Sequence, residues 1–129
     1  MPPEGSSYAA EWLRVAVKDW HRVEQLLHLG DPEAAGFYLQ QAVEKFLKAF
    51  LLARGWKLER AHDLEVLLNA AIPHDRSLES FREICQRITG FYLMERYPDV
   101  AGDELTDADV RQALERVREL VEKLRSVER

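Results

Sequence analysis

The sequence of 129 residues lacks several features that would tie it to a common class of protein. Its single cysteine, Cys85, excludes an internal disulfide and a zinc site built from several cysteines. We therefore expect Cys85 to behave as a small buried apolar side chain in a reducing compartment. The sequence has no run of 18 apolar residues and no secretory signal segment, which predicts a soluble, cytoplasmic protein that makes no membrane contact.

An excess of positive charge is also missing. The formal net charge is −5, so the overall field of the protein repels nucleic acid and anionic lipid. Binding of RNA stays open only through a local basic patch. With 47% hydrophobic and 32% charged residues, the composition is that of a globular protein, and the length suits one domain. We expect a single helical domain over residues 1–129, with residues 1–6 as an N-terminal tail.

Alternating strand patterns are absent, and helical periodicity runs through nearly the whole chain instead. A first helix is predicted over residues 7–28, and Gly30 ends it. Asp31 and Pro32 then form a helix start, an N-cap followed by proline in the first turn. The second helix is predicted to run to about Arg54. Two apolar lines mark its buried face: Leu39, Val43, Phe46 and Phe50, and beside them Ala42, Leu47 and Leu51.

The second half of the chain predicts three further helices. A short one is capped by Asp63 and closed by Pro73. Another covers about 77–93, and Gly90 predicts a weakened, bent end. After a loop at 95–106, Thr106 and the aspartate three residues later resemble a capping box for the last helix. The sequence therefore predicts an all-α, up-and-down antiparallel bundle of four to five helices.

Three segments in this order resemble the HEPN domain family. They are FYLQQAVEKFLKAFLLARGW, then HDLEVLL after a short loop, and ERYPD before a final amphipathic helix. The resemblance spans about residues 8–125. It implies a helical bundle that commonly dimerises, found in small bacterial and archaeal proteins that are often paired with a minimal nucleotidyltransferase. Many such pairs are toxin–antitoxin modules, and the family name records a proposed nucleotide-binding role.

One branch of that family cleaves RNA without metal, using an Arg and a His in the late helices with four to six residues between them. Arg14 and His21 have this spacing, as do Arg22 and His28, but about one such match is expected by chance. No histidine follows His74, so the late helices hold no imidazole for general acid–base chemistry. We expect a member with no catalytic residues, no metal and no cofactor; a ribonuclease toxin with atypical catalytic residues remains the alternative.

Four residues are candidates for binding a nucleotide or a partner: Lys48, His62, Arg96 and Tyr97. Pro98 fixes the backbone after Arg96 and Tyr97, so the guanidinium and the ring could stack on a base and contact a phosphate. The same stretch could equally be a helix stop whose arginine pairs with nearby acids. If it forms a site, these side chains should face a common groove, where a local cationic field selects a phosphate or an acidic partner loop.

Other interpretations of two candidates are favoured by their neighbours. Lys45 and Lys48 lie one turn apart beside Glu44, a pattern more typical of a solvated helix face than of a phosphate site. His62 and Asp63 together are more typical of a helix cap than of a ligand contact.

The sequence also predicts association between copies of the chain. The last helix repeats apolar residues in four- and three-residue steps, the first helix is long, and three tryptophans are expected to serve as core or interface anchors. This is more apolar surface than a thin bundle needs. We expect a homodimer that uses faces of the first or fourth helix region. The seam comprises Val110, Leu114, Val117, Val121 and Leu124, and the tryptophans are Trp12, Trp20 and Trp56.

Overall fold

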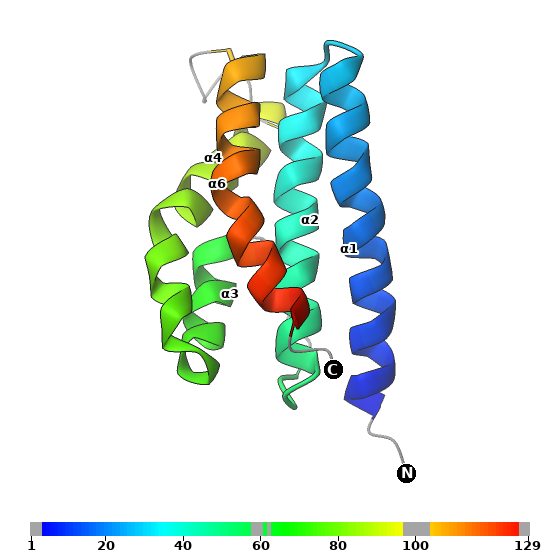
Figure 1. Cartoon of the computed structure of the whole chain (residues 1–129), viewed down its shortest axis with the longest axis vertical. Helices are drawn as coiled ribbons and strands as arrows, with labels where there is room; N and C mark the ends of the chain where they lie inside the picture. Colours follow the sequence, from blue (N-terminus) through cyan, green and yellow to red (C-terminus); the bar gives the residue numbers. More distant parts are fainter. Residues whose placement is uncertain (1–3, 58–60, 62, 97–103, 127–129) are drawn as a thin grey trace.

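The computed structural model describes residues 4–57, 61, 63–96 and 104–126, which form five α-helices, two short 3-10 helices and no strand (Figure 1). Helices α1 (Glu4–His28), α2 (Pro32–Leu52), α4 (Arg82–Arg96) and α6 (Asp107–Ser126) run alternately up and down. The short α3 (Leu64–Ala71) packs against α2 and α4. The predicted all-α antiparallel bundle is confirmed. Among the described residues, no helix is long and apolar enough to cross a membrane.

The hairpin between α1 and α2 follows the predicted signals. Gly30 adopts a φ of +79°, and the next N–H, that of Asp31, donates to the carbonyl of Leu26 at 2.9 Å. This is the glycine-ended helix terminus that a left-handed residue permits. The Asp31 carboxylate then accepts from the backbone N–H of Ala34 at 3.2 Å and caps α2. One boundary differs: α1 begins at Glu4, inside the segment expected to be a tail.

The fourth predicted helix differs from the structure at both ends. Its first part, Arg76–Phe81, is a 3-10 helix, and α4 then continues to Arg96, past the predicted end at residue 93. Gly90 does not interrupt it. Ile88 and Phe91 on either side of Gly90 are buried, so core packing stabilises the helix across a residue of poor helical propensity. The loop predicted to begin at residue 95 therefore begins later.

Helix α6 starts as predicted. The Thr106 hydroxyl accepts from the backbone N–H of Asp109, and the Asp109 carboxylate accepts from the N–H of Thr106, both at 3.1 Å. This reciprocal pair satisfies two N–H groups that would otherwise lack helical partners. The apolar seam of α6 is buried throughout, with Val110 and Val117 fully so.

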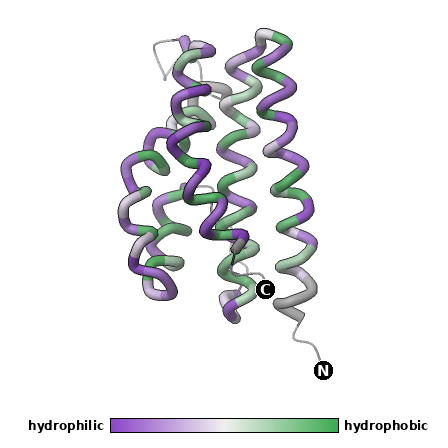
Figure 2. Tube along the Cα trace, in the orientation of Figure 1, coloured by the Kyte–Doolittle hydropathy of each residue, from purple (hydrophilic) through white to green (hydrophobic). Residues whose placement is uncertain are grey.

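Helices α1 and α2 meet along two rows of small residues. The α1 row is Ala9, Ala16 and Val23, and the α2 row is Ala35, Ala42 and Ala49; each row repeats every seven residues and is at most 2% exposed. Small side chains let two helices approach closely along their whole length. Figure 2 shows apolar and hydrophilic residues alternating along the bundle's helices. Helix α1 stands at one edge (Figure 1), where it packs on α2 and touches α6, so much of its surface is uncovered.

The three tryptophans are all partly buried, none completely. Trp20 and Trp56 pack against the central core, and Trp20 meets Phe46 edge to face at 6.2 Å between ring centroids. Cys85 is fully buried, as predicted.

Candidate functional site

A chain of charged and amide side chains lies between the apolar layers of α1 and α2. Glu44 and Lys48, one turn apart on α2, are only 3% and 4% exposed. The Lys48 ammonium donates to Glu44 Oε2 at 2.8 Å, and the Gln40 amide donates to Glu44 Oε1 at 3.1 Å. The indole of Trp12 covers the ammonium, with 5.1 Å between Nζ and the ring centroid. Among the described residues, no buried side-chain nitrogen or oxygen lacks a hydrogen bond.

A second pair of contacts ties α1 to α2. Asp19, fully buried on α1, accepts from Lys45 Nζ of α2 at 2.5 Å and from Arg22 of the next helical turn at 2.6 Å. The Arg22 guanidinium lies 5.4 Å from the centroid of the Tyr38 ring. We call the buried set Asp19, Gln40, Glu44, Lys45 and Lys48 the polar ladder.

The polar ladder corrects the interpretation of Lys45 and Lys48 as a solvated face. The side chain of Lys45 is 19% exposed and that of Lys48 only 6%. Burial of a charged group is costly unless it is paired, and both ammonium groups are paired. The sequence held a usable signal. Asp19 lies three residues after one buried α1 alanine and four before a buried valine, so a carboxylate on that apolar face requires a cation from a neighbouring helix.

The structure describes only two of the four candidate residues, Lys48 and Arg96. Lys48 belongs to the polar ladder, His62 and Tyr97 lie outside the described residues, and Arg96 is described only as the last residue of α4. A Cβ added at Gly36 would lie 3.4 Å from Phe91 Cβ, which aligns the start of α2 with the end of α4. Lys48 lies twelve residues further along α2, about 18 Å at 1.5 Å per residue.

Because α4 runs opposite to α2, Arg96 lies on the other side of that level from Lys48 (Figure 1). The described structure therefore does not bring Lys48 to the end of α4. The binding roles of His62, Arg96 and Tyr97 stay predictions.

An aromatic cluster lies beside the last turn of α4. The rings of Phe37 and Tyr92 stack with 5.8 Å between centroids and 18° between planes. Tyr38 meets Phe37 edge on at 5.4 Å. All three side chains are half-buried, and Tyr92 precedes Arg96 by one helical turn. The last turn of α4, which ends at Arg96, thus lies next to an aromatic surface that sequence reasoning did not identify.

A shallow cavity of about 270 Å³ opens on the outer side of the α1–α2 pair. Glu11, Trp12 and Val15 of α1 line it together with Lys45 of α2. Tyr8, one turn before Trp12, is 54% exposed. Tyr8, Trp12 and Val15 follow each other in steps of four and three residues, so they form one apolar stripe along α1. Trp12 and Val15 are half-buried beside α2, and Tyr8 is the exposed member.

The titratable groups that nucleophilic or acid–base chemistry would use are few. Burial raises the pKa of the Cys85 thiol to about 12, which keeps it protonated and unreactive near neutral pH. His21 and His28 are exposed on α1, and His74 lies against the Phe50 ring at 6.2 Å. In the part of the chain that the structure describes, no three His, Cys, Asp or Glu side chains are grouped closely enough to hold a metal ion.

Comparison with known proteins agrees with this architecture. The family model of the HEPN domain matches residues 9–127. The chain belongs to the HEPN domain family. The HEPN fold is also that of TT1696 from Thermus thermophilus, which is 30% identical and has a TM-score of 0.80; the likeness covers 92% of this chain and 96% of that one.

An archaeal HEPN homologue, ST0689, shares the fold at 21% identity. Its TM-score is 0.75, and the likeness covers 94% of this chain and 98% of that one. A search among curated proteins found no match.

Proposed function

We propose that this HEPN protein works by binding a minimal nucleotidyltransferase protein, as one member of a toxin–antitoxin-type pair. The observation that carries the proposal is the pairing of the polar ladder. Lys48, Glu44 and Gln40 satisfy one another inside the bundle, so these groups serve the fold. The groups that another molecule can contact then lie on the exposed helix faces. Exposed helix faces are surfaces to which partner proteins bind.

The same proposal assigns no catalytic role to this chain. Metal-independent RNA cleavage requires groups that exchange protons near neutral pH, and the sequence after His74 has no histidine. Cys85 stays protonated in the core. These properties favour binding over the alternative, a ribonuclease toxin with atypical catalytic residues.

We also propose that the protein is a homodimer. The apolar stripe of Tyr8, Trp12 and Val15 runs along α1 at the edge of its contact with α2, and Tyr8 is 54% exposed. In a two-fold dimer the same patch meets itself, so an apolar stripe is self-complementary without any matching charges.

A small nucleotidyltransferase gene beside the gene of this protein would support the proposal, and co-expression of the two proteins tests it. We expect the two proteins to co-purify, and light scattering to give a mass that contains two copies of this chain. A strict monomer at tens of micromolar would contradict the dimer. Failure to co-purify, together with RNA cleavage that persists in chelator, would replace the proposed function with the ribonuclease alternative.

A nucleotide is the second candidate ligand, because the Phe37–Tyr92 stack lies one turn from Arg96. An aromatic surface near an arginine in the chain is a combination that can bind a base and a phosphate. ATP, AMP and short RNA should be titrated against the wild type and Arg96→Ala. Saturable binding that weakens about tenfold in the variant supports a nucleotide site. Absence of binding to both proteins excludes it.

A further inference from the structure

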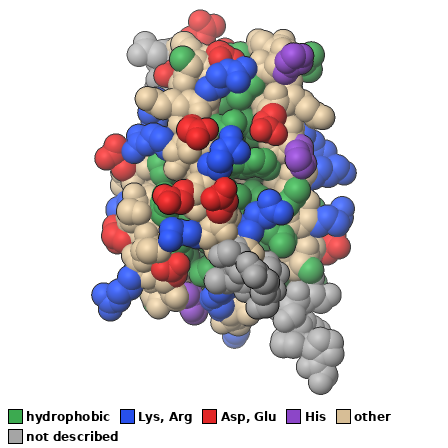
Figure 3. All heavy atoms as spheres, in the orientation of Figure 1, with side chains coloured by type: hydrophobic (Ala, Val, Ile, Leu, Met, Phe, Trp, Pro, Cys, Tyr) green, Lys and Arg blue, Asp and Glu red, His purple; other side chains and the backbone are tan. Residues whose placement is uncertain are grey.

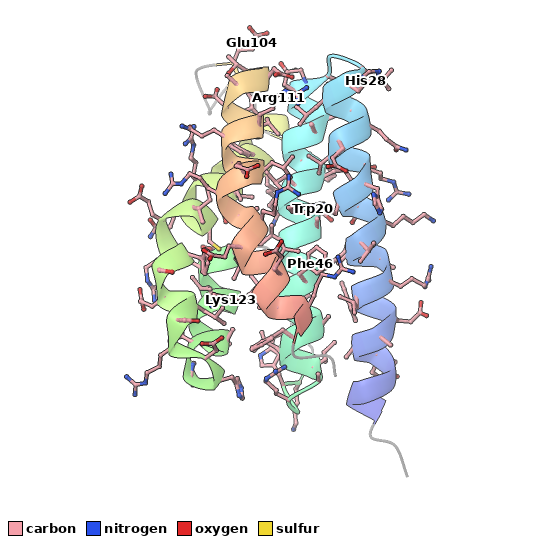
Figure 4. The ribbon with its side chains drawn as sticks, viewed as in Figure 1. Trp20, His28, Phe46, Glu104, Arg111 and Lys123 are labelled. Atoms are coloured by element: carbon pink, nitrogen blue, oxygen red, sulfur yellow. The ribbon has the colours of Figure 1, made fainter. Side chains whose placement is uncertain are left out.

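Helix α6 carries an arginine every seven residues along one edge: Arg111, Arg118 and Arg125. Each directly follows a buried residue of the α6 seam, so the three share one side of the apolar face. Seven residues advance a helix by about 10.5 Å, in nearly two complete turns. We call these three residues the arginine line. Figure 4 labels Arg111 on α6, on the side of the bundle that faces the viewer.

The arginine line borders an apolar surface between α6 and α1. The Arg118 guanidinium lies 5.8 Å from the Trp20 ring centroid, and that of Arg125 lies 6.0 Å from the Phe46 centroid. In Figure 4, Trp20 and Phe46 lie between α6 and α1. Val17 and Leu13, half-buried one and two turns before Trp20, continue the apolar surface along α1. We call the surface formed by Leu13, Val17, Trp20 and the arginine line the front groove; Phe46, 1% exposed, lies beneath it.

In Figure 3, apolar side chains run along the middle of this face, with Lys and Arg side chains among and beside them. The protein as a whole carries a net charge of −5. Two of the three cations, Arg111 and Arg118, already pair with acids of α6, so the charge that a partner meets depends on replacing those pairs.

The bundle itself makes little use of these guanidinium groups. Arg111 pairs with Asp107 at 2.6 Å and Arg118 with Glu115 at 3.6 Å, but both arginine side chains are over 40% exposed. Exposed ion pairs of this kind are weak, so an incoming carboxylate can replace them at small cost. The aliphatic stems can remain over the aromatic rings while the guanidinium N–H groups turn to a new acceptor.

We propose that the front groove binds an amphipathic helix of a partner protein. The apolar stripe of that helix lies over Leu13, Val17 and Trp20. Its flank carries Asp or Glu at seven-residue intervals, because only a helix repeats a side-chain position at the spacing of the arginine line. Each carboxylate accepts from one guanidinium. That the helix belongs to a nucleotidyltransferase rests on the proposed function, whereas the preference of the groove for an acidic helix does not.

The test uses a synthetic amphipathic peptide about three heptads long, with Leu on one face and Glu on its flank. A matched peptide carries Lys in place of each Glu. Binding to the full chain is measured by calorimetry for wild type, Arg118→Glu and Arg116→Glu. Arg116 is the matched control, since it lies on α6 but faces Glu83 of α4 at 3.9 Å.

We expect the Glu peptide to bind the wild type saturably and the Lys peptide not to bind. Arg118→Glu should weaken binding by at least about tenfold, while Arg116→Glu changes it by less than about twofold. Melting curves check the fold of each variant. If Arg118→Glu does not fold, Arg118→Gln replaces it, with weakening of at least about threefold expected.

Equal weakening by the two charge reversals would overturn the proposal, because general charge would then explain the binding. Binding of neither peptide would also overturn it. A short RNA that binds with the same Arg118 dependence, while the Glu peptide does not, would assign the groove to RNA instead. If the nucleotidyltransferase complex forms equally well with Arg118→Glu, the groove fails and the proposed function stands. If the Glu peptide binds as expected but no complex with a nucleotidyltransferase forms, the proposed function fails and the front groove stands.

Discussion

Lys48 is the residue at which burial and charge conflict most directly. Its ammonium is paired with Glu44 at 2.8 Å and covered by Trp12. We expect Lys48→Met to lower the free energy of unfolding by about 3 kcal/mol or more, because the buried Glu44 carboxylate loses this cation. The same change at the exposed Lys18 should stay within about 0.5 kcal/mol. Urea unfolding measures both, and equal effects would mean that Lys48 is solvated in solution.

Cys85 gives a second prediction at the scale of one side chain. Its thiol is buried, and its pKa is raised to about 12. Since only the thiolate reacts with disulfide and alkylating reagents, folded protein at pH 8 should be labelled far more slowly than protein unfolded in urea. A labelling rate in the native state close to that of a free thiol would contradict the buried placement.

At this scale the sequence predicted what depends on near neighbours. The burial of Cys85 and the caps at Asp31 and Asp63 were predicted correctly, because each follows from residue type and local spacing. The environment of Lys48 was not, because its burial depends on Trp12, which lies on another helix. Local spacing shows that Lys48 and Glu44 can pair; it does not show that a neighbouring helix covers them.

The pairing of α1 with α2 depends on small residues at the contact. Ala16 is fully buried in this seam, whereas Ala10 on the same helix is exposed. We expect Ala16→Leu to cost about 1–3 kcal/mol of stability, because the added volume must separate the helices or strain their side chains. Ala10→Leu is the control, expected to change stability by less than about 0.5 kcal/mol. If thermal or urea unfolding shows that Ala10→Leu lowers stability more than Ala16→Leu, the contact of α1 and α2 through small residues would be excluded.

The start of α6 links an element to pH. Hydrogen bonding with Thr106 lowers the pKa of the Asp109 carboxyl below its unfolded value of about 3.9. The bond from the backbone N–H of Thr106 has the larger effect, and its side chain the smaller. A lowered folded pKa stabilises the protein above the unfolded pKa, and this contribution is lost as pH falls through the folded pKa. Asp109→Ala should therefore be less stable than wild type at pH 7, and the difference should narrow below about pH 4.

Glu119→Ala, an exposed change on the same helix, serves as the control and should show almost no difference at either pH. A gap between Asp109→Ala and wild type that widens on acidification would have the wrong sign for this account.

Among the elements, those with their own start and stop signals were predicted well. Helix α2 has the predicted cap Asp31 before it, which the structure bears out, and Gly55 adopts a φ of +86° just after its end. The region from Arg76 to Arg96 was predicted less accurately. Its 3-10 opening and its continuation past Gly90 reflect packing on the core, which outweighs the low helical propensity of glycine.

For the whole molecule, the fold and the family were predictable, while the surfaces that could bind a partner were not. Helical periodicity determines which face of each helix is buried, and this is sufficient for an antiparallel bundle. The front groove requires α6 to lie beside α1, although Arg118 and Trp20 are almost a hundred residues apart in sequence. The separation of Lys48 from the end of α4 has the same origin, since it depends on the relative directions of α2 and α4.

We propose that this HEPN protein binds its partner on exposed helix faces and that its buried polar groups take no part in the binding. Hydrogen–deuterium exchange of the full chain, with and without a saturating nucleotidyltransferase partner, tests this most directly. The account predicts slower exchange along the described parts of α1 and α6 that border the front groove, with α3 unchanged. Unchanged exchange in α1 and α6 at saturation would contradict it, as would protection confined to α3 and the 3-10 helix Arg76–Phe81.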